Sequence, residues 1–102
     1  NFITNKQITS HVIYLDSYEV LPSLKNNIVL IENADPGYDW IFSQGISGLV
    51  TKYGGANSHM AIRCAEFGIP AAIGCGEQRF ETLFKAQQIN LDCSSGLITI
   101  IN

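Results

Sequence analysis

The stretch Tyr53–Gly74 reads YGGANSHMAIRCAEFGIPAAIG, and it decides how we expect the chain to fold. It follows an apolar run, Ile46 to Val50, which predicts a strand. Gly54 and Gly55 then allow a tight turn with positive φ, a conformation in which a side chain would clash. The sequence therefore predicts that this strand ends in a glycine turn.

A short helix is predicted directly after the glycine turn. Either Asn57 or Ser58 can cap it by accepting a hydrogen bond from an N–H group of the first turn. No residue from His59 to Phe67 breaks a helix, Gly68 stands where a C-terminal glycine belongs, and Pro70 forbids continuation. The helix therefore carries a histidine in its first turn.

His59 is the main candidate for a chemical role. The N-terminus of a helix offers unpaired N–H groups and a partial positive charge, which favour a bound anion and disfavour a protonated imidazole. A neutral imidazole beside an anion-stabilising turn suits attack on phosphorus to give a phosphohistidine, and Ser58 could orient the ring or bond the phosphoryl group. From spacing alone, a surface histidine near a helix cap explains the pattern at least as well.

Two segments resemble a known signature. Gly54–Ile62 and Glu66–Gly74, with the glycine pair, Ser-His and Gly-Ile-Pro in this order, resemble the phosphohistidine mobile domain of the phosphoenolpyruvate-utilising enzymes. These include pyruvate phosphate dikinase, phosphoenolpyruvate synthase and enzyme I of the sugar phosphotransferase system. The similarity continues through Ile28–Thr51 and Asp92–Ile101 and so covers most of the chain.

The sequence departs from the family pattern around the histidine. Asn57 replaces the usual threonine, Met60 replaces a small residue, and Cys64-Ala65 replaces the usual Ala-Arg pair before the glutamate. Arg63 lies two positions earlier than the family's arginine, which on a helix turns it by about 200°. These departures leave the nucleophile in place and leave open which enzyme the domain serves.

The resemblance implies a fold and a function. The fold would be α/β, the swivelling β/β/α phosphohistidine domain, with a mixed sheet partly covered by helices. His59 Nε2 would take a phosphoryl group as a covalent intermediate and carry it between a nucleotide site and a phosphoenolpyruvate/pyruvate site or another acceptor. Ser58 would orient or stabilise that group, and Gly54, Gly55 and Asn57 would bind phosphate. The whole enzyme would be a phosphotransferase of the paired-acceptor, dikinase type, and this domain alone would not turn over.

The expected partners are other domains of the same longer chain. The resemblance implies an ATP-grasp-like nucleotide-binding domain and a phosphoenolpyruvate/pyruvate-binding domain. The sequence contains neither a Walker-type glycine-lysine motif nor an acidic metal cage, so we expect no metal or cofactor on this domain. Mg²⁺ and ATP are expected on the partner domains. The final acceptor, which among relatives includes water, a glucan, rifamycin and a carrier protein, stays open.

Two other functions are compatible with parts of the sequence. The altered Asn57 and Cys64-Ala65 allow a non-catalytic swivel or interaction module that kept the fold without phosphotransfer, whereas the intact glycine pair, Ser58 and His59 argue against it. A thiol or zinc site using His59 and Cys64 is disfavoured because residues five apart do not share one helix face.

Composition limits the remaining classes of function. The 102 residues fit a single domain, 1–102, and a start without methionine suggests a piece excised from a longer multidomain chain. A net charge of −3 without a basic cluster argues against nucleic acid or an anionic membrane as a partner, and no apolar run is long enough for a transmembrane helix. The 3 cysteines are widely spaced, which favours free thiols in the cytoplasm.

The first part of the chain predicts two strands. Ile8–Leu15 is rich in β-forming residues and contains His11, which we interpret as a structural or surface histidine. Asp16–Asn27 is a connection with room for one helical turn, in which Leu21 and Leu24 cover the core. Ile28–Ile31 is continuously apolar, as expected for a strand covered on both faces.

Helices and strands alternate through the rest. Asp35-Pro36 is typical of a helix start, and Tyr38, Ile41 and Phe42 then fall on one side; the resemblance makes Asp35 a weak candidate to support the site. Further segments predict a strand at Ile69–Ile73, a helix at Glu77–Gln87 that buries Phe80, Leu83 and Phe84, and two short strands, Ile89–Leu91 and Leu97–Ile101, around a turn.

Overall fold

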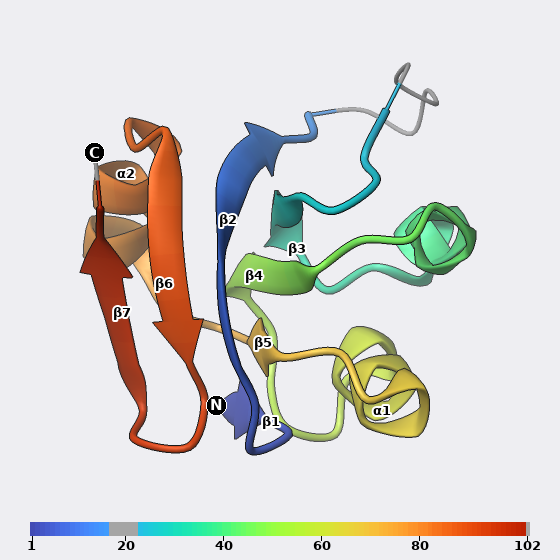
Figure 1. The fold of residues 1–102 in the computed structure, drawn as a ribbon. Coiled ribbons are helices and arrows are strands. Elements are labelled where there is room, and N and C mark those ends of the chain that lie inside the picture. The colour runs from blue at the N-terminus through green and yellow to red at the C-terminus, as the bar shows by residue number, and fades with distance from the viewer. Residues whose placement is uncertain (17–22, 102) are drawn as a thin grey trace.

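Strands and short helices alternate along the chain, as the sequence predicts. The computed structural model describes residues 1–16 and 23–101. In chain order its elements are β1 (Phe2–Ile3), β2 (Gln7–Tyr14), β3 (Ile28–Asn33), the 3-10 helix η1 (Pro36–Ser43), β4 (Gly48–Tyr53), α1 (His59–Phe67), β5 (Ala71–Ala72), α2 (Glu77–Phe84), β6 (Gln88–Asp92) and β7 (Leu97–Ile100). Figure 1 shows η1 and α1 on one side of the central strands, with α2 and the β6–β7 hairpin on the other.

The described strands form one mixed sheet in the order β1-β5-β4-β3-β2-β6-β7. Strands β2, β3, β4 and β5 run parallel to one another, with Val29 of β3 paired to Leu49 of β4, whereas β1 is antiparallel to β5, β6 to β2, and β7 to β6. The predicted mixed α/β sheet is therefore confirmed. Strand β1 was not predicted, because its 2 residues carry no readable period and pair with the equally short β5.

Strand β3 separates two hydrophobic cores. Its residues Val29 and Ile31 belong to the core under η1 and α1, while Ile28 and Leu30 belong to the core under α2 and β6. All four side chains are fully buried. The continuous apolar run follows from this placement, because side chains of a strand point alternately to its two faces.

The helix after β3 differs in type from an α-helix. Asp35 caps it as predicted, accepting a hydrogen bond of 2.9 Å from the Gly37 N–H, but residues 36–43 form a 3-10 helix. Tyr38 and Ile41 are buried, whereas Phe42 is half-buried and stacks on Phe67 of α1 with the ring centroids 5.5 Å apart.

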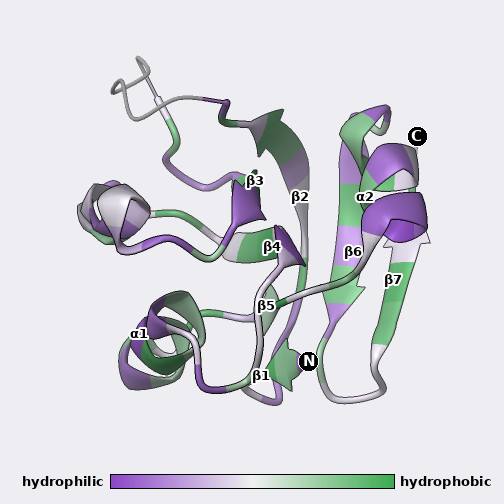
Figure 2. Ribbon diagram, turned by 180° about the vertical axis from the view of Figure 1, so that it is seen from behind, coloured by the Kyte–Doolittle hydropathy of each residue, from purple (hydrophilic) through white to green (hydrophobic). Residues whose placement is uncertain are grey.

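Helix α2 is shorter than predicted and buries less of its aromatic face. It ends at Phe84 rather than at Gln87. Phe80 and Leu83 are buried as expected, but the expected burial of Phe84 is wrong, because its side chain is 49% exposed. Phe84 instead packs edge-to-face with Tyr14, with the ring centroids 4.7 Å apart. Figure 2 shows hydrophilic residues on the turns of α2 that face away from the sheet.

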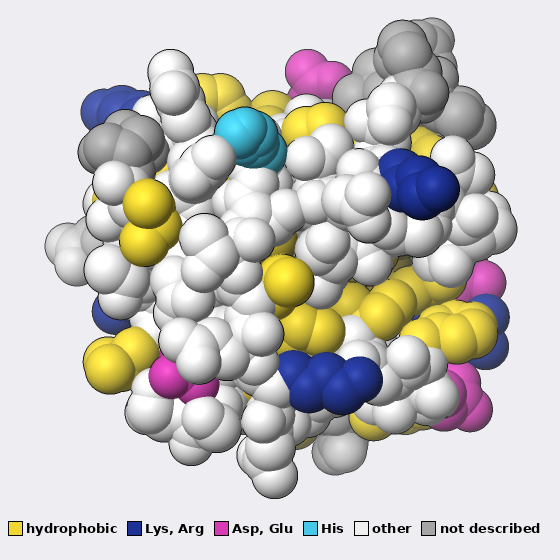
Figure 3. Space-filling model, viewed as in Figure 1, with side chains coloured by type: hydrophobic (Ala, Val, Ile, Leu, Met, Phe, Trp, Pro, Cys, Tyr) yellow, Lys and Arg dark blue, Asp and Glu magenta, His cyan; other side chains and the backbone are white. Residues whose placement is uncertain are grey.

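The remaining expectations concern the connection and the surface. Leu24 is fully buried as predicted, while Leu21 and the possible helical turn lie outside the described residues. His11 is exposed on β2 and lies within 3.3 Å of the Gln88 amide nitrogen, which fits a surface histidine. Lys and Arg side chains stand apart from one another on the face drawn in Figure 3. None of the helices described is both long and apolar enough to cross a membrane.

Candidate functional site

Strand β4 and a glycine turn deliver the first turn of α1 to the surface. Leu49, Val50 and Thr51 are fully buried, so the strand is fixed between the two cores. Gly54 follows with φ +127°, and a Cβ there would come within 2.7 Å of the Ala34 Cβ. A glycine is therefore required at 54 both by conformation and by space.

Gly55 does not have the conformation that the sequence predicted. Its φ is not among the positive values, which belong to Gly54 in this turn. Among the described residues, no atom lies within 4 Å of a Cβ added at Gly55. The prediction that both glycines adopt positive φ is therefore wrong for Gly55, and a small side chain fits there without strain.

The turn is braced by the segment that leads to α2. Gly74 lies so close to Gly54 that a Cβ at 74 would come within 2.2 Å of the Gly54 carbonyl oxygen. The buried Thr51 hydroxyl accepts a hydrogen bond of 2.8 Å from the Gly74 N–H and donates one of 2.9 Å to the Tyr53 carbonyl. Thr51 and Gly74 thereby fix where β4 ends and where the chain toward α1 begins.

Helix α1 begins at the predicted residue and has the predicted cap. The Ser58 hydroxyl accepts a hydrogen bond of 3.4 Å from the Ala61 N–H, which places the cap at Ser58 rather than at Asn57. Gly68 ends the helix in the left-handed conformation. Met60 and Cys64 are fully buried in the core, so His59 is directed outward, and its side chain is 41% exposed.

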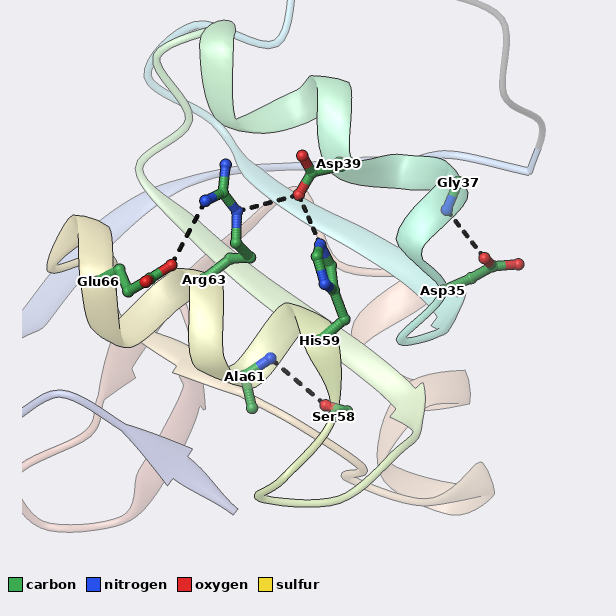
Figure 4. A network of polar contacts seen from close by, with 8 residues as sticks. All are labelled: Asp35, Gly37, Asp39, Ser58, His59, Ala61, Arg63 and Glu66. Carbon is green, nitrogen blue, oxygen red and sulfur yellow. Dashed lines mark hydrogen bonds and ion pairs between the residues drawn. The ribbon is translucent and has the colours of Figure 1, made fainter.

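A carboxylate from another element meets the His59 ring. Asp39 of η1 places its Oδ1 2.9 Å from His59 Nε2 and 3.1 Å from Arg63 Nε, as Figure 4 shows. The hydrogen bond from His59 lowers the pKa of Asp39, and Arg63 lowers it further. Arg63 also contacts Glu66, with 3.4 Å between its terminal nitrogen and the carboxylate. Asp39 is therefore ionised at neutral pH and holds two side chains of α1.

Sequence reasoning missed Asp39 and gave that supporting role to Asp35. Asp35 caps η1 at Gly37, and Figure 4 shows it away from the His59 ring. One signal was available: His59 and Arg63 are four residues apart, so they share a helix face on which one anion can contact both. That signal does not identify the carboxylate, since Asp39 lies 20 positions away in sequence.

The predicted site residues fall in two groups. Ser58 and His59 lie together at the start of α1, with the cap hydroxyl beside the first-turn N–H groups. Gly54, Gly55 and Asn57 precede them in the exposed loop between β4 and α1. The chain thus exposes an imidazole and a helix N-terminus on one surface, an arrangement that can present a nucleophilic nitrogen beside donors for an anion.

A shared thiol or zinc site does not fit this geometry. Cys64 is fully buried while His59 is exposed, and burial raises the pKa of the Cys64 thiol to about 12. Within residues 1–16 and 23–101, no group of three His, Cys, Asp or Glu side chains could hold a metal ion. The cysteines at 64, 75 and 93 are all free.

Comparison with known proteins identifies relatives across most of this fold. The family described as "PEP-utilising enzyme, mobile domain" matches residues 24–96, from the end of the first connection to the β6–β7 turn. The matched region includes Asp39, the glycine turn and the whole of α1.

Several curated proteins match the same region. A phosphoenolpyruvate synthase of Synechocystis is 41% identical over 69 residues, which are 67% of this chain and 8% of that protein. A phosphoenolpyruvate synthase of Neisseria meningitidis is 33% identical over 69% of this chain and 9% of its own length. A rifampicin phosphotransferase of Streptomyces sviceus is 32% identical over 74% of this chain and 8% of its own length. The chain therefore spans less than a tenth of the length of these relatives.

Proposed function

Because the chain belongs to the family of the PEP-utilising enzyme mobile domain, we propose that it is a phosphoryl-carrying domain in which His59 forms a phosphohistidine. The observation that carries the proposal is the position of His59. It is the first residue of α1, it is 41% exposed, and it lies at a helix N-terminus, which can bind an anion without a charged side chain.

The surroundings of His59 support the chemistry. The first turn of α1, His59 to Ile62, contains no carboxylate, so its N–H groups and partial positive charge can act on an external phosphoryl group. Ser58 keeps a hydroxyl proton that it can donate to a phosphoryl oxygen. The exposed Gly55 and Asn57 backbone lets a donor site approach closely.

The reaction divides into two displacements at phosphorus. In the first, a neutral imidazole nitrogen attacks the phosphoryl donor, an N–P bond forms, and the P–O bond breaks with its electron pair leaving on the donor oxygen. In the second, the acceptor oxygen attacks and the N–P bond breaks. A covalent intermediate of this kind lets one protein join two substrates that never meet. By resemblance to the family, we assign the phosphoryl group to Nε2.

We further propose that the donors and acceptors bind to other domains of a longer chain. The relatives named above are far longer than the matched region, and two of them are named for phosphoenolpyruvate and for rifampicin. In the proposal, a nucleotide-binding, ATP-grasp-like domain with Mg²⁺ supplies one site and a phosphoenolpyruvate/pyruvate or alternative acceptor domain supplies the other. Swivelling of the present domain would carry the phosphoryl group between them, as in a dikinase-type phosphotransferase.

The test uses the full-length protein. It is incubated with Mg²⁺ and either phosphate-labelled ATP or labelled phosphoenolpyruvate, and the His59 peptide is examined for a phosphate that is labile in acid and stable in base. We expect label from at least one donor, complete loss of label in His59→Ala, and unchanged label in the matched control His11→Ala. His59→Ala should stay folded, because the side chain contributes little to either core. Absence of label from both donors would instead favour a non-catalytic swivel or interaction module.

A further inference from the structure

One oxygen atom of Asp39 links two side chains of α1. Oδ1 lies 2.9 Å from His59 Nε2 and 3.1 Å from Arg63 Nε. The three side chains are between 33% and 42% exposed, so the group lies at the surface where a phosphoryl donor would approach. Figure 4 shows the ring of His59 turned toward η1, the element that carries Asp39.

The protonation of this contact follows from the carboxylate. The pKa of Asp39 is lowered, chiefly by the hydrogen bond with His59, so at neutral pH the carboxylate only accepts hydrogen bonds. The nitrogen that faces it, Nε2, must therefore carry a proton, and a neutral ring then has its lone pair on Nδ1. In this orientation Nε2 cannot attack phosphorus.

We propose that Asp39 is a latch that holds the unphosphorylated His59 ring with Nε2 protonated, and that the ring must leave Asp39 before Nε2 accepts a phosphoryl group. Asp39 is then a positioning residue rather than a catalytic one. The proposal rests on the proposed function for the choice of Nε2 as the phosphorylated atom.

Arg63 lowers the free energy needed to release the His59 ring from Asp39. When His59 leaves, Asp39 keeps its hydrogen bond with Arg63 and is not left unpaired. Arg63 is itself held in place by Glu66 and by the Phe67 ring, whose centroid lies 4.8 Å from the guanidinium carbon. Opening the latch therefore breaks one exposed hydrogen bond, which is the small cost expected of such pairs.

Phosphorylation would keep the latch open. The released ring moves its proton from Nε2 to Nδ1 through solvent, so no net proton is lost. Attack then forms the Nε2–P bond as the donor P–O bond breaks and its electron pair leaves on oxygen. The product carries a negatively charged phosphoryl group on Nε2, and the Asp39 carboxylate repels that group. The ring returns to Asp39 only after the phosphoryl group has been passed on.

A small chemical phosphoryl donor, phosphoramidate, tests the latch in the 102-residue chain without any partner domain. The chain has 2 histidines, so exposed His11 on β2 is an internal reference for intrinsic reactivity. The measured quantity is the ratio of the phosphorylation rates of His59 and His11, followed by phosphorus NMR. We expect this ratio to rise about two- to fivefold in Asp39→Ala, as an exposed pair of this kind predicts.

Two further variants make the result specific. Asp39→Asn keeps the shape of the side chain and should raise the ratio in the same direction by less. Glu66→Gln removes a nearby carboxylate that bonds Arg63, and it should leave the ratio unchanged. An equal rise in Glu66→Gln would mean that only general repulsion of the anionic donor has been removed, and it would overturn the latch.

Nitrogen NMR of the unphosphorylated ring provides the second readout. In the wild-type chain His59 should be the Nε2–H tautomer, and this preference should weaken in Asp39→Ala while His11 stays unchanged. An unchanged tautomer, or phosphorylation at Nδ1 with Nε2–H retained, would overturn the proposal. Neither readout uses ATP or phosphoenolpyruvate, so failure of the phosphoryl-carrier function in the full-length protein remains distinguishable from failure of the latch.

Discussion

Helices α1 and α2 both follow a short parallel strand through a glycine-containing turn, yet their first turns differ in chemistry. Helix α1 begins with His59 after the capping side chain of Ser58. Helix α2 begins with Glu77 after Gly76, which has φ +93° and no side chain to cap with. The Glu77 carboxylate already supplies the negative charge that a helix N-terminus favours.

The difference separates a structural helix start from one that is available for function. Glu77 balances the partial positive charge at the N-terminus of α2, and its carboxylate accepts a hydrogen bond of 2.8 Å from the Tyr53 hydroxyl. The charge at that helix end is therefore balanced within the domain. The N-terminus of α1 has a neutral cap and no acidic residue in its first turn, so its partial positive charge remains available to an external anion. The two starts are nevertheless joined, because Gly74 lies against Gly54.

Replacing Gly74 should damage both helix starts at once, and it is the largest effect that we expect. In Gly74→Ala the new Cβ would lie 2.2 Å from the Gly54 carbonyl oxygen at a backbone φ of +72°. Strain of this conformation and overpacking together should reduce the free energy of unfolding by about 3–4 kcal/mol. Urea denaturation measures the loss.

Gly55→Ala is the matched control for the same turn. A Cβ at 55 meets no atom of the described residues within 4 Å, so the free energy of unfolding should change by less than about 0.5 kcal/mol. Equal losses in the two variants would show that the turn has a different conformation from the one described.

Removing the cap of α1 should have an intermediate effect. Ser58→Ala removes the acceptor for the Ala61 N–H, and the 3.4 Å length of this bond places the expected loss near the lower part of the usual range, about 0.5–1 kcal/mol. The same variant should slow labelling of His59 without preventing it, since the other first-turn N–H groups remain.

A hydroxyl on α2 provides the control for this variant. Thr82 is exposed and donates to the Gln78 carbonyl within the helix, so Thr82→Ala should leave the stability unchanged or raise it by a few tenths of a kcal/mol. A loss in Thr82→Ala as large as that in Ser58→Ala would remove the special role of the cap.

Local signals predicted the segment around His59 accurately. Helix α1 begins at His59 and ends at Phe67 as expected, because Ser58 and Gly68 supply cap chemistry that can be read over a few residues. Strand β3 was predicted equally well, because a strand that is covered on both faces is expected to be continuously apolar, as Ile28–Ile31 is. The glycine turn was found as well, but its positive φ was assigned to Gly55 in addition to Gly54.

Features made by distant contacts were not predicted. The Asp39–His59 pair depends on η1 packing beside α1, and no local rule gives that distance. The need for glycine at 74 arises from the Gly54 carbonyl, a contact that the sequence does not display. Phe84 was expected in the core from its helical spacing, but the helix ends there and Tyr14 becomes its neighbour. Tertiary packing decides each of these.

The smallest expected effect tests whether the Glu77 carboxylate at the N-terminus of α2 is held within the domain by the Tyr53 hydroxyl. Glu77 accepts the hydrogen bond of the Tyr53 hydroxyl and thereby raises the pKa of Tyr53 above its ordinary value of 10.0, because the bond stabilises the protonated phenol. In Glu77→Gln the pKa of Tyr53 should fall back toward 10.0, as measured by NMR titration of the tyrosine rings. A raised pKa in the folded state stabilises the fold below the ordinary pKa, and this contribution is lost as the pH rises through the folded value. The stability of the wild-type chain relative to Glu77→Gln should therefore decrease only in alkaline solution, above about pH 10.

Tyr14, whose pKa is raised to about 12 by Glu32, provides the control because its titration should not move. If Tyr53 titrates identically in both chains, Glu77 does not hold it, and the contrast between the two helix starts rests on the caps alone.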